Sequence, residues 1–147
     1  MKNLSLTLVA FVLLFTSCDS LFDNGDNEKV YNGPDVVGFF PLEQTISAST
    51  TSGTSVEVQL IGEQKTSDVS VSYAVHSSTT ATSGTHYTVS GTSVTIPANS
   101  STADINVGLS PGDLTPGQEV KLVLELQGGS GLQASENLKL ATIFIRP

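Results

Sequence analysis

The residues that could carry out chemistry are few in this chain of 147 residues. Cys18 is the only cysteine, so no disulfide can form within the chain, and His76 and His86 are the only histidines. A zinc site needs three or four nitrogen, sulfur or carboxylate ligands, which this set supplies poorly. Serine and threonine are abundant, but the G-x-S-x-G motif that exposes a nucleophilic serine is absent. The inventory predicts a protein that is not an enzyme and that holds no metal or cofactor.

The residues before Cys18 have the features of an export signal. Lys2 places a positive charge at the start, an almost unbroken apolar run covers residues 4–15, and two small polar residues follow. A helix of that length spans roughly 18 Å, whereas the hydrocarbon core of a bilayer is about 30 Å thick, so the run is too short to cross it comfortably. We therefore predict that residues 1–17 are a signal peptide.

Residues 15–18, Phe-Thr-Ser-Cys, resemble a bacterial lipobox, in which a lipidated cysteine becomes the mature N-terminus. The usual first residue is leucine, and Phe15 departs from it. The resemblance implies a diacylglyceryl thioether and an N-acyl chain on Cys18, and two or more chains make attachment durable. The alternative is an ordinary signal peptide followed by a free cysteine. It is disfavoured because a lone exposed thiol is a liability in an oxidising compartment.

The lipobox predicts an exported protein whose partner is a bacterial cell membrane, held through the lipid on Cys18. The outer membrane is favoured over the inner membrane. Asp19 follows the cysteine, and in some bacteria that residue retains a lipoprotein at the inner membrane. Because sorting rules differ between lineages, Asp19 carries little weight.

Residues 18–35 are predicted to form an acidic flexible tether. Aspartate, asparagine and glycine dominate this stretch, and four acids fall between Asp19 and Glu28. Such a composition buries too little apolar surface to offset the entropy of ordering. As a random coil, residues 19–35 would span about 20–25 Å. The alternative is an acidic surface-export signal, which the residues match poorly.

The charge balance excludes one class of partner. The formal net charge is −8, and no basic stripe is present. Nucleic-acid binding requires such a stripe to neutralise phosphates, so no nucleic-acid partner is predicted.

From Val36 onward the hydrophobic pattern has period two, which is typical of half-buried strands. No stretch shows a convincing helical period. Val36–Phe40 is predicted as a first edge strand, broken by Pro41, with a second half that begins at Glu43. Turn-forming residues separate the runs. This spacing predicts an all-β fold: one antiparallel sandwich of about seven or eight strands over residues 36–147. The other alternating runs cover residues 55–60, 69–75, 94–96, 105–109, 120–126 and 138–145.

Three segments together resemble Calx-beta domains. Residues 81–87 are similar to the family's A-x-x-G-x-D-Y segment, with His86 in place of the aspartate. Residues 94–107 are similar to its strand, proline-containing turn and next strand, and residues 117–124 resemble its G-D-E strand. Each motif alone is weak, but their order and spacing agree over about residues 36–147. The resemblance implies an immunoglobulin-like sandwich.

Some Calx-beta domains bind Ca²⁺ in loops at one end of the sandwich, but this chain lacks most of the acids involved. Calcium takes six to eight oxygen ligands, many of them carboxylates. Only Asp113 and Glu119 match acidic positions of the family, and we expect both to be ordinary solvated loop acids. Calcium binding by this route is therefore predicted to be lost. The family's other acids are replaced by Ala48, His86, Pro111, Gly112, Pro116 and Gln118.

A few further residues have predicted structural roles. His86 is expected at a strand end, His76 in a loop, and Tyr87 could make the hydrogen bond of a sandwich corner. Phe39 and Phe40 are adjacent, so in a strand they point to opposite faces, one into the core and one to solvent.

The sequence favours a non-catalytic, lipid-anchored envelope protein whose sandwich serves adhesion, scaffolding or partner binding. The alternative is an accessory ligand- or glycan-binding lipoprotein of an uptake system. Tyr31, Tyr73 and Tyr87 are too few and scattered to indicate a platform for stacking sugars.

Overall fold

The computed structural model describes residues 33–49, 51–110 and 112–147. The predicted signal peptide, Cys18 and most of the predicted tether lie outside these residues. Within the described part there is no helix, and hence none that could cross a bilayer.

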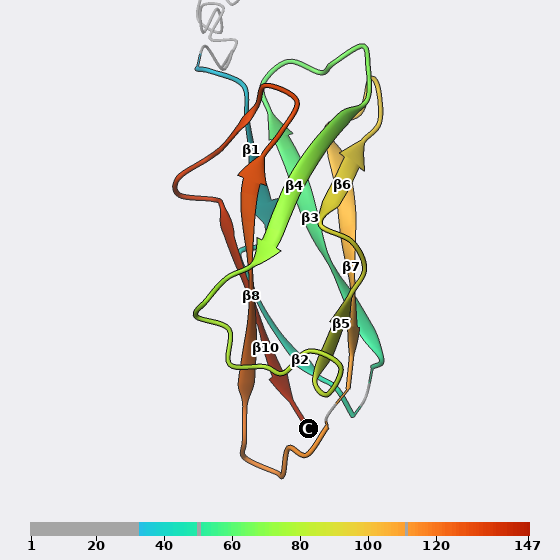
Figure 1. The fold of residues 1–147 in the computed structure, drawn as a ribbon, viewed down its shortest axis with the longest axis vertical. Helices are drawn as coiled ribbons and strands as arrows, with labels where there is room; N and C mark the ends of the chain where they lie inside the picture. The colour runs from blue at the N-terminus through green and yellow to red at the C-terminus, as the bar shows by residue number, and fades with distance from the viewer. Residues whose placement is uncertain (1–32, 50, 111) are drawn as a thin grey trace, which may run out of the picture. The chain divides into compact units, whose positions relative to one another are not determined.

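Ten strands form two five-stranded sheets (Figure 1). The all-β sandwich predicted from the sequence is therefore confirmed, although the strands outnumber the seven or eight expected. In spatial order, sheet A contains β5 (Tyr87–Val89), β7 (Thr102–Leu109), β3 (Gly53–Ile61), β1 (Val36–Phe40) and β9 (Gln133–Ala134). Sheet B contains β2 (Glu43–Ser47), β10 (Leu140–Arg146), β8 (Val120–Gly128), β4 (Val69–Val75) and β6 (Ser93–Ile96).

The chain changes sheets at Pro41. β1 pairs with β3 in sheet A, and β2 runs parallel to β10 in sheet B. Proline has no N–H to donate to a ladder, so it ends one strand and allows the next to turn away. The break predicted at Pro41 is confirmed.

The prediction that β1 is an edge strand is wrong. The two-residue strand β9 lies parallel to its first half, with Val36 opposite Gln133 and Val37 opposite Ala134. A strand this short shows no period in the sequence, so neither it nor the two parallel pairings could be read there. The remaining strand pairs are antiparallel.

The core lies between the two sheets and follows the period-two pattern. The buried side chains of β3 and β8, which lie in different sheets, belong to one cluster that solvent barely reaches: Val56, Val58 and Leu60, and Leu122, Leu124 and Leu126. Burial of such side chains is the main term that stabilises a domain of this size.

The described domain has two opposite ends. Residues 48–49, 51–52, 76–86, 110, 112–119 and 146–147 gather at the lower end in Figure 1, which we call the loop end. The chain enters at the upper end, at residues 33–35. Asp35, predicted as the last tether residue, pairs there with Lys65 and accepts a hydrogen bond from the backbone N–H of Glu63 at 3.1 Å.

Replacing Leu124 by alanine should lower the free energy of unfolding by about 2–5 kcal/mol, because the side chain is fully buried and leaves a cavity. The matched control is Leu140→Ala, where 39% of the residue is exposed and the loss should stay below about 1 kcal/mol. Urea denaturation of both variants measures the difference. Equal losses would contradict the assignment of the core.

Candidate functional site

His86 is held at the loop end by both of its ring nitrogens. The backbone N–H of Thr82 donates to Nδ1 at 2.9 Å, so Nδ1 carries no proton. Nε2 is then protonated and donates to a carboxylate oxygen of Asp113 at 3.0 Å. The imidazole, with 7% of the side chain exposed, thereby joins the segment before β5 to the loop after β7. A ring with neither nitrogen free has no atom left to act as a general base.

The hydrogen bond from His86 lowers the pKa of the Asp113 carboxyl. Its side chain is 86% exposed, yet the hydrogen bond from His86 holds the pKa of the carboxyl below its ordinary value of 3.8, helped by a backbone hydrogen bond. Asp113 is therefore solvated as expected, but it is also tied to the domain.

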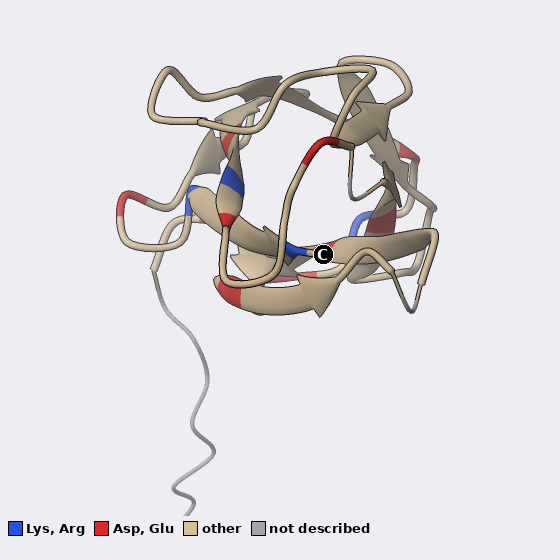
Figure 2. Cartoon of the chain, turned by 90° about the horizontal axis from the view of Figure 1, so that it is seen from below, with Lys and Arg blue, Asp and Glu red and all other residues tan. Residues whose placement is uncertain are grey.

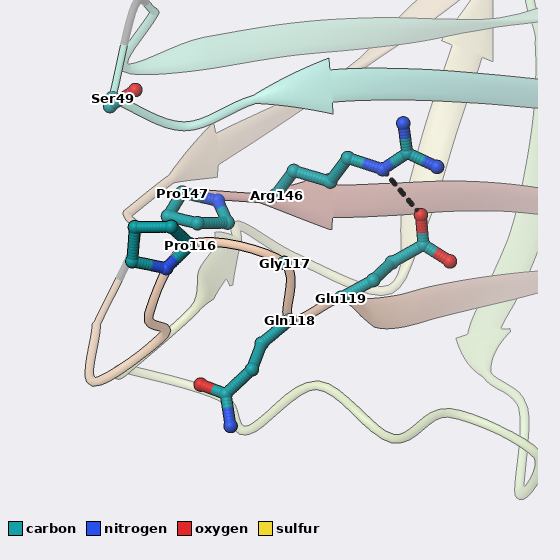
Figure 3. A pocket seen from close by; sticks show the side chains of 7 residues that line it. All are labelled: Ser49, Pro116, Gly117, Gln118, Glu119, Arg146 and Pro147. Carbon is teal, nitrogen blue, oxygen red and sulfur yellow. Dashed lines mark hydrogen bonds and ion pairs between the residues drawn. The ribbon is translucent and has the colours of Figure 1, made fainter.

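The second acid that matches the calcium-site pattern is paired as well. The Nε–H of Arg146, at the end of β10, donates to Glu119 Oε2 at 2.7 Å (Figure 3). The register of β10 against β8 places Ile145 opposite Val120, and this brings the two side chains together. Glu119 is exposed and lies just before β8, as expected of a solvated loop acid, and it is also paired with Arg146.

The Glu119–Arg146 pair lines an open pocket of about 780 Å³. The loop before β8 forms one wall and is closed on itself, because the backbone N–H and the hydroxyl of Thr115 both donate to Gln118 Oε1, at 2.8 and 3.0 Å. Figure 2 looks onto this end of the domain from below. The other lining residues are Ser49, Pro116, Gly117 and Pro147.

The remaining sequence-predicted residues fall in separate places. His76 lies in the segment after β4, as expected, with Nδ1 2.8 Å from the hydroxyl of Ser78. Phe39 is buried and Phe40 is exposed, which confirms their predicted division. Tyr87 is buried in β5, and its corner hydrogen bond stays a prediction. The hydroxyl of Tyr73, on β4, donates to the carbonyl of Ser90 at 3.0 Å. Burial raises the pKa of Tyr73.

Sequence reasoning missed Thr82 and Arg146. Arg146 is the only arginine of the chain, and an antiparallel pairing of the last two long strands would have placed it near Glu119. The contact with Thr82 had no signal, because it uses a backbone N–H that every residue except proline carries.

No group of three His, Cys, Asp or Glu side chains that could hold a metal ion occurs in the part of the chain that the structure describes. The two acids that match the calcium-site pattern each engage a side chain of the same domain instead.

Comparisons with known proteins identify the fold. No protein-family model and no curated protein matches the chain. Among solved structures, the apo-form Calx CBD1 domain matches with a TM-score of 0.65 at 17% identity, over 78% of this chain and 97% of that one. A proposed carbohydrate binding protein from Bacteroides ovatus matches with a TM-score of 0.59 at 18% identity, over 76% of this chain. This chain spans only 36% of that protein's length.

A third similar structure is the Escherichia coli chaperone DraB, with a TM-score of 0.52 at 14% identity, over 78% of this chain and 56% of that one. The described domain thus has the fold of Calx CBD domains, as the sequence resemblance predicted. By name, none of these three similar proteins is an enzyme.

Replacing Asp113 by asparagine should lower the thermal midpoint at pH 7 and have little effect at low pH. Folding lowers the pKa of this carboxyl, so its charged form stabilises the fold above the ordinary value of 3.8. That contribution is lost as the pH falls through the lowered folded value. Melting curves of both proteins from pH 7 to below about pH 3 measure the difference.

The charge-matched control is Glu43→Gln, at an exposed acid on β2. A midpoint difference for Asp113→Asn that persists unchanged at the lowest pH would contradict the role given to the Asp113 carboxylate.

Proposed function

We propose that this protein is a lipid-anchored, non-catalytic binding module that presents its loop end to a partner in the cell envelope. The observation that carries the proposal is the open pocket at the loop end, whose walls are fixed by contacts within the chain. A pocket of about 780 Å³ has the volume of a small-ligand or peptide side-chain site.

Catalysis is not part of this proposal. The buried histidine uses both nitrogens in structural hydrogen bonds. Among the described residues that line the pocket, Glu119 supplies the one carboxylate side chain, and that group is paired with Arg146. A general acid–base mechanism needs a titratable group free to exchange a proton with a bound substrate.

The proposed anchor at Cys18 would orient the domain relative to the membrane. The chain enters the domain at the end opposite the pocket, and Asp35 fixes that entry point through Lys65 and the N–H of Glu63. A lipid on Cys18 would therefore place the Asp35 end toward the membrane and the pocket away from it. The partner would then meet the domain from the side facing away from the lipid.

Calcium has no role in this proposal. The contacts of His86 and Arg146 do what bound cations do in other loops, because they hold acidic loops in place. We therefore expect the loop end to stay ordered without metal.

A glycan is the second candidate ligand, which would make the protein an accessory lipoprotein of an uptake system. The carbohydrate binding described for the similar Bacteroides ovatus protein favours it. A glycan array probed with the full chain in detergent distinguishes a glycan ligand from a protein partner. Specific glycan binding that is lost in Arg146→Ala would favour the glycan.

Replacing Cys18 by alanine should release the protein from the membrane fraction or leave it unprocessed, because no acyl chain can then be attached. Ser17→Ala keeps a small residue before the cysteine and should remain anchored. Fractionation with mass spectrometry of the N-terminal peptide measures both variants. A Cys18→Ala protein that is cleaved cleanly and stays on the membrane would disprove the anchor.

Adding millimolar Ca²⁺ or EDTA should leave the thermal midpoint unchanged, because two paired carboxylates cannot supply the six to eight oxygens that calcium requires. Mg²⁺ at the same ionic strength is the control. A midpoint that rises by more than about 5 °C with Ca²⁺ alone would show a calcium site and overturn this part of the proposal.

A further inference from the structure

A row of three side chains crosses the outer face of sheet A. In register, Phe40 of β1 lies opposite Glu57 of β3, and Glu57 lies opposite Asp104 of β7. Their neighbours along each strand, among them Phe39, Val58 and Ile105, are buried, so all three members point away from the core. We call these three residues the outer row.

The outer row lies at a depression in the surface of sheet A. Phe40 is 61% exposed, although an aromatic ring of this size is usually covered. Together with Pro41 and Ser55, the row lines an open depression of about 290 Å³. The depression and the 780 Å³ pocket at the loop end share no lining residue.

The two carboxylates of the outer row have no basic partner among the described residues. Lys65, Lys139 and Arg146 are each paired with another acid, and Lys121 lies on β8 in the other sheet. Glu57 accepts a hydrogen bond from the neutral side-chain amide of Gln59, at 2.6 Å. Like charges directly opposite each other on neighbouring strands destabilise a sheet. The free domain thus carries a local repulsion that a bound cation would relieve.

We propose that the outer row is a docking site for an arginine side chain of a partner protein. A guanidinium group is planar, so it can stack on the exposed ring of Phe40 while its N–H fork reaches carboxylates beside the ring. Hydrogen bonds between a guanidinium and a carboxylate are charge-assisted and stronger than neutral ones. The charge of the site is complementary to this group, and the chain as a whole, at −8, attracts cationic partners.

The inference does not depend on the lipid anchor or on the loop-end pocket, since no residue is common to them. It places a second contact surface on the side of the sandwich. A partner could therefore occupy the loop end and the sheet face at once.

The test is a titration of the full chain in detergent micelles. The measured quantity is the NMR chemical shift of each backbone amide in the strands. The probe is N-acetyl-arginine amide at millimolar concentrations, and N-acetyl-citrulline amide is the neutral control of nearly equal shape. We expect saturable shifts at Phe40, Glu57 and Asp104 with the arginine probe and none with citrulline. Equal shifts with both probes, or shifts spread evenly over all acidic residues, would overturn the proposal.

Two sets of variants separate the site from general charge attraction. Glu57→Gln with Asp104→Asn, and separately Phe40→Leu, should weaken binding of the arginine probe roughly three- to tenfold. Glu43→Gln with Glu63→Gln removes the same charge at exposed acids elsewhere and should leave the affinity unchanged. An equal loss in this control variant, or saturable binding of a neutral oligosaccharide at the outer row, would contradict the arginine assignment.

Thermal stability without the probe gives an independent readout. Because the double variant Glu57→Gln, Asp104→Asn removes a repulsion, its midpoint should equal or exceed that of the parent chain. A clear decrease in the midpoint would mean that the acids support the fold, and it would count against a binding role.

Discussion

Burial of two apolar sheet faces against each other holds this domain together, since the one cysteine of the chain excludes an internal disulfide. The inner positions of β3, β4, β7, β8 and β10 are filled almost entirely by valine, leucine and isoleucine. A small domain without disulfides depends on such a core for most of its stability. The loops and outer faces are then free to carry charge, because the core does not depend on them.

At the loop end, charged and polar side chains contact one another outside the apolar core. Asp113 and Glu119 stand at positions that match acidic residues of Calx-beta domains, and each is engaged by a cationic or hydrogen-bonding group of the same chain. His86 occupies the place of an aspartate, and its two nitrogens connect two loops. The pocket beside Arg146 is lined by side chains that contact one another.

Period-two patterns were enough to predict the sandwich, the inward residues of the long strands and the opposite fates of Phe39 and Phe40. They could not predict β9 or the parallel neighbours of β1 and β10, because those pairings are set by how the sheets fold over one another. The contact of Thr82 with His86 leaves no signal in the sequence because it uses a backbone N–H, and the contact of Arg146 with Glu119 depends on the register of β10 against β8. A sequence shows which side chains are present, whereas register decides which of them meet.

The side chains of the loop end hold its loops together through His86 and Arg146. The most direct test is the exchange rate of the Thr82 backbone amide, which donates to His86 Nδ1. We expect this amide to be protected equally in EDTA and in Ca²⁺, and His86→Ala to remove the protection. An amide that exchanges freely in EDTA and becomes protected only when Ca²⁺ is added would show that the ion, rather than His86, orders the loop.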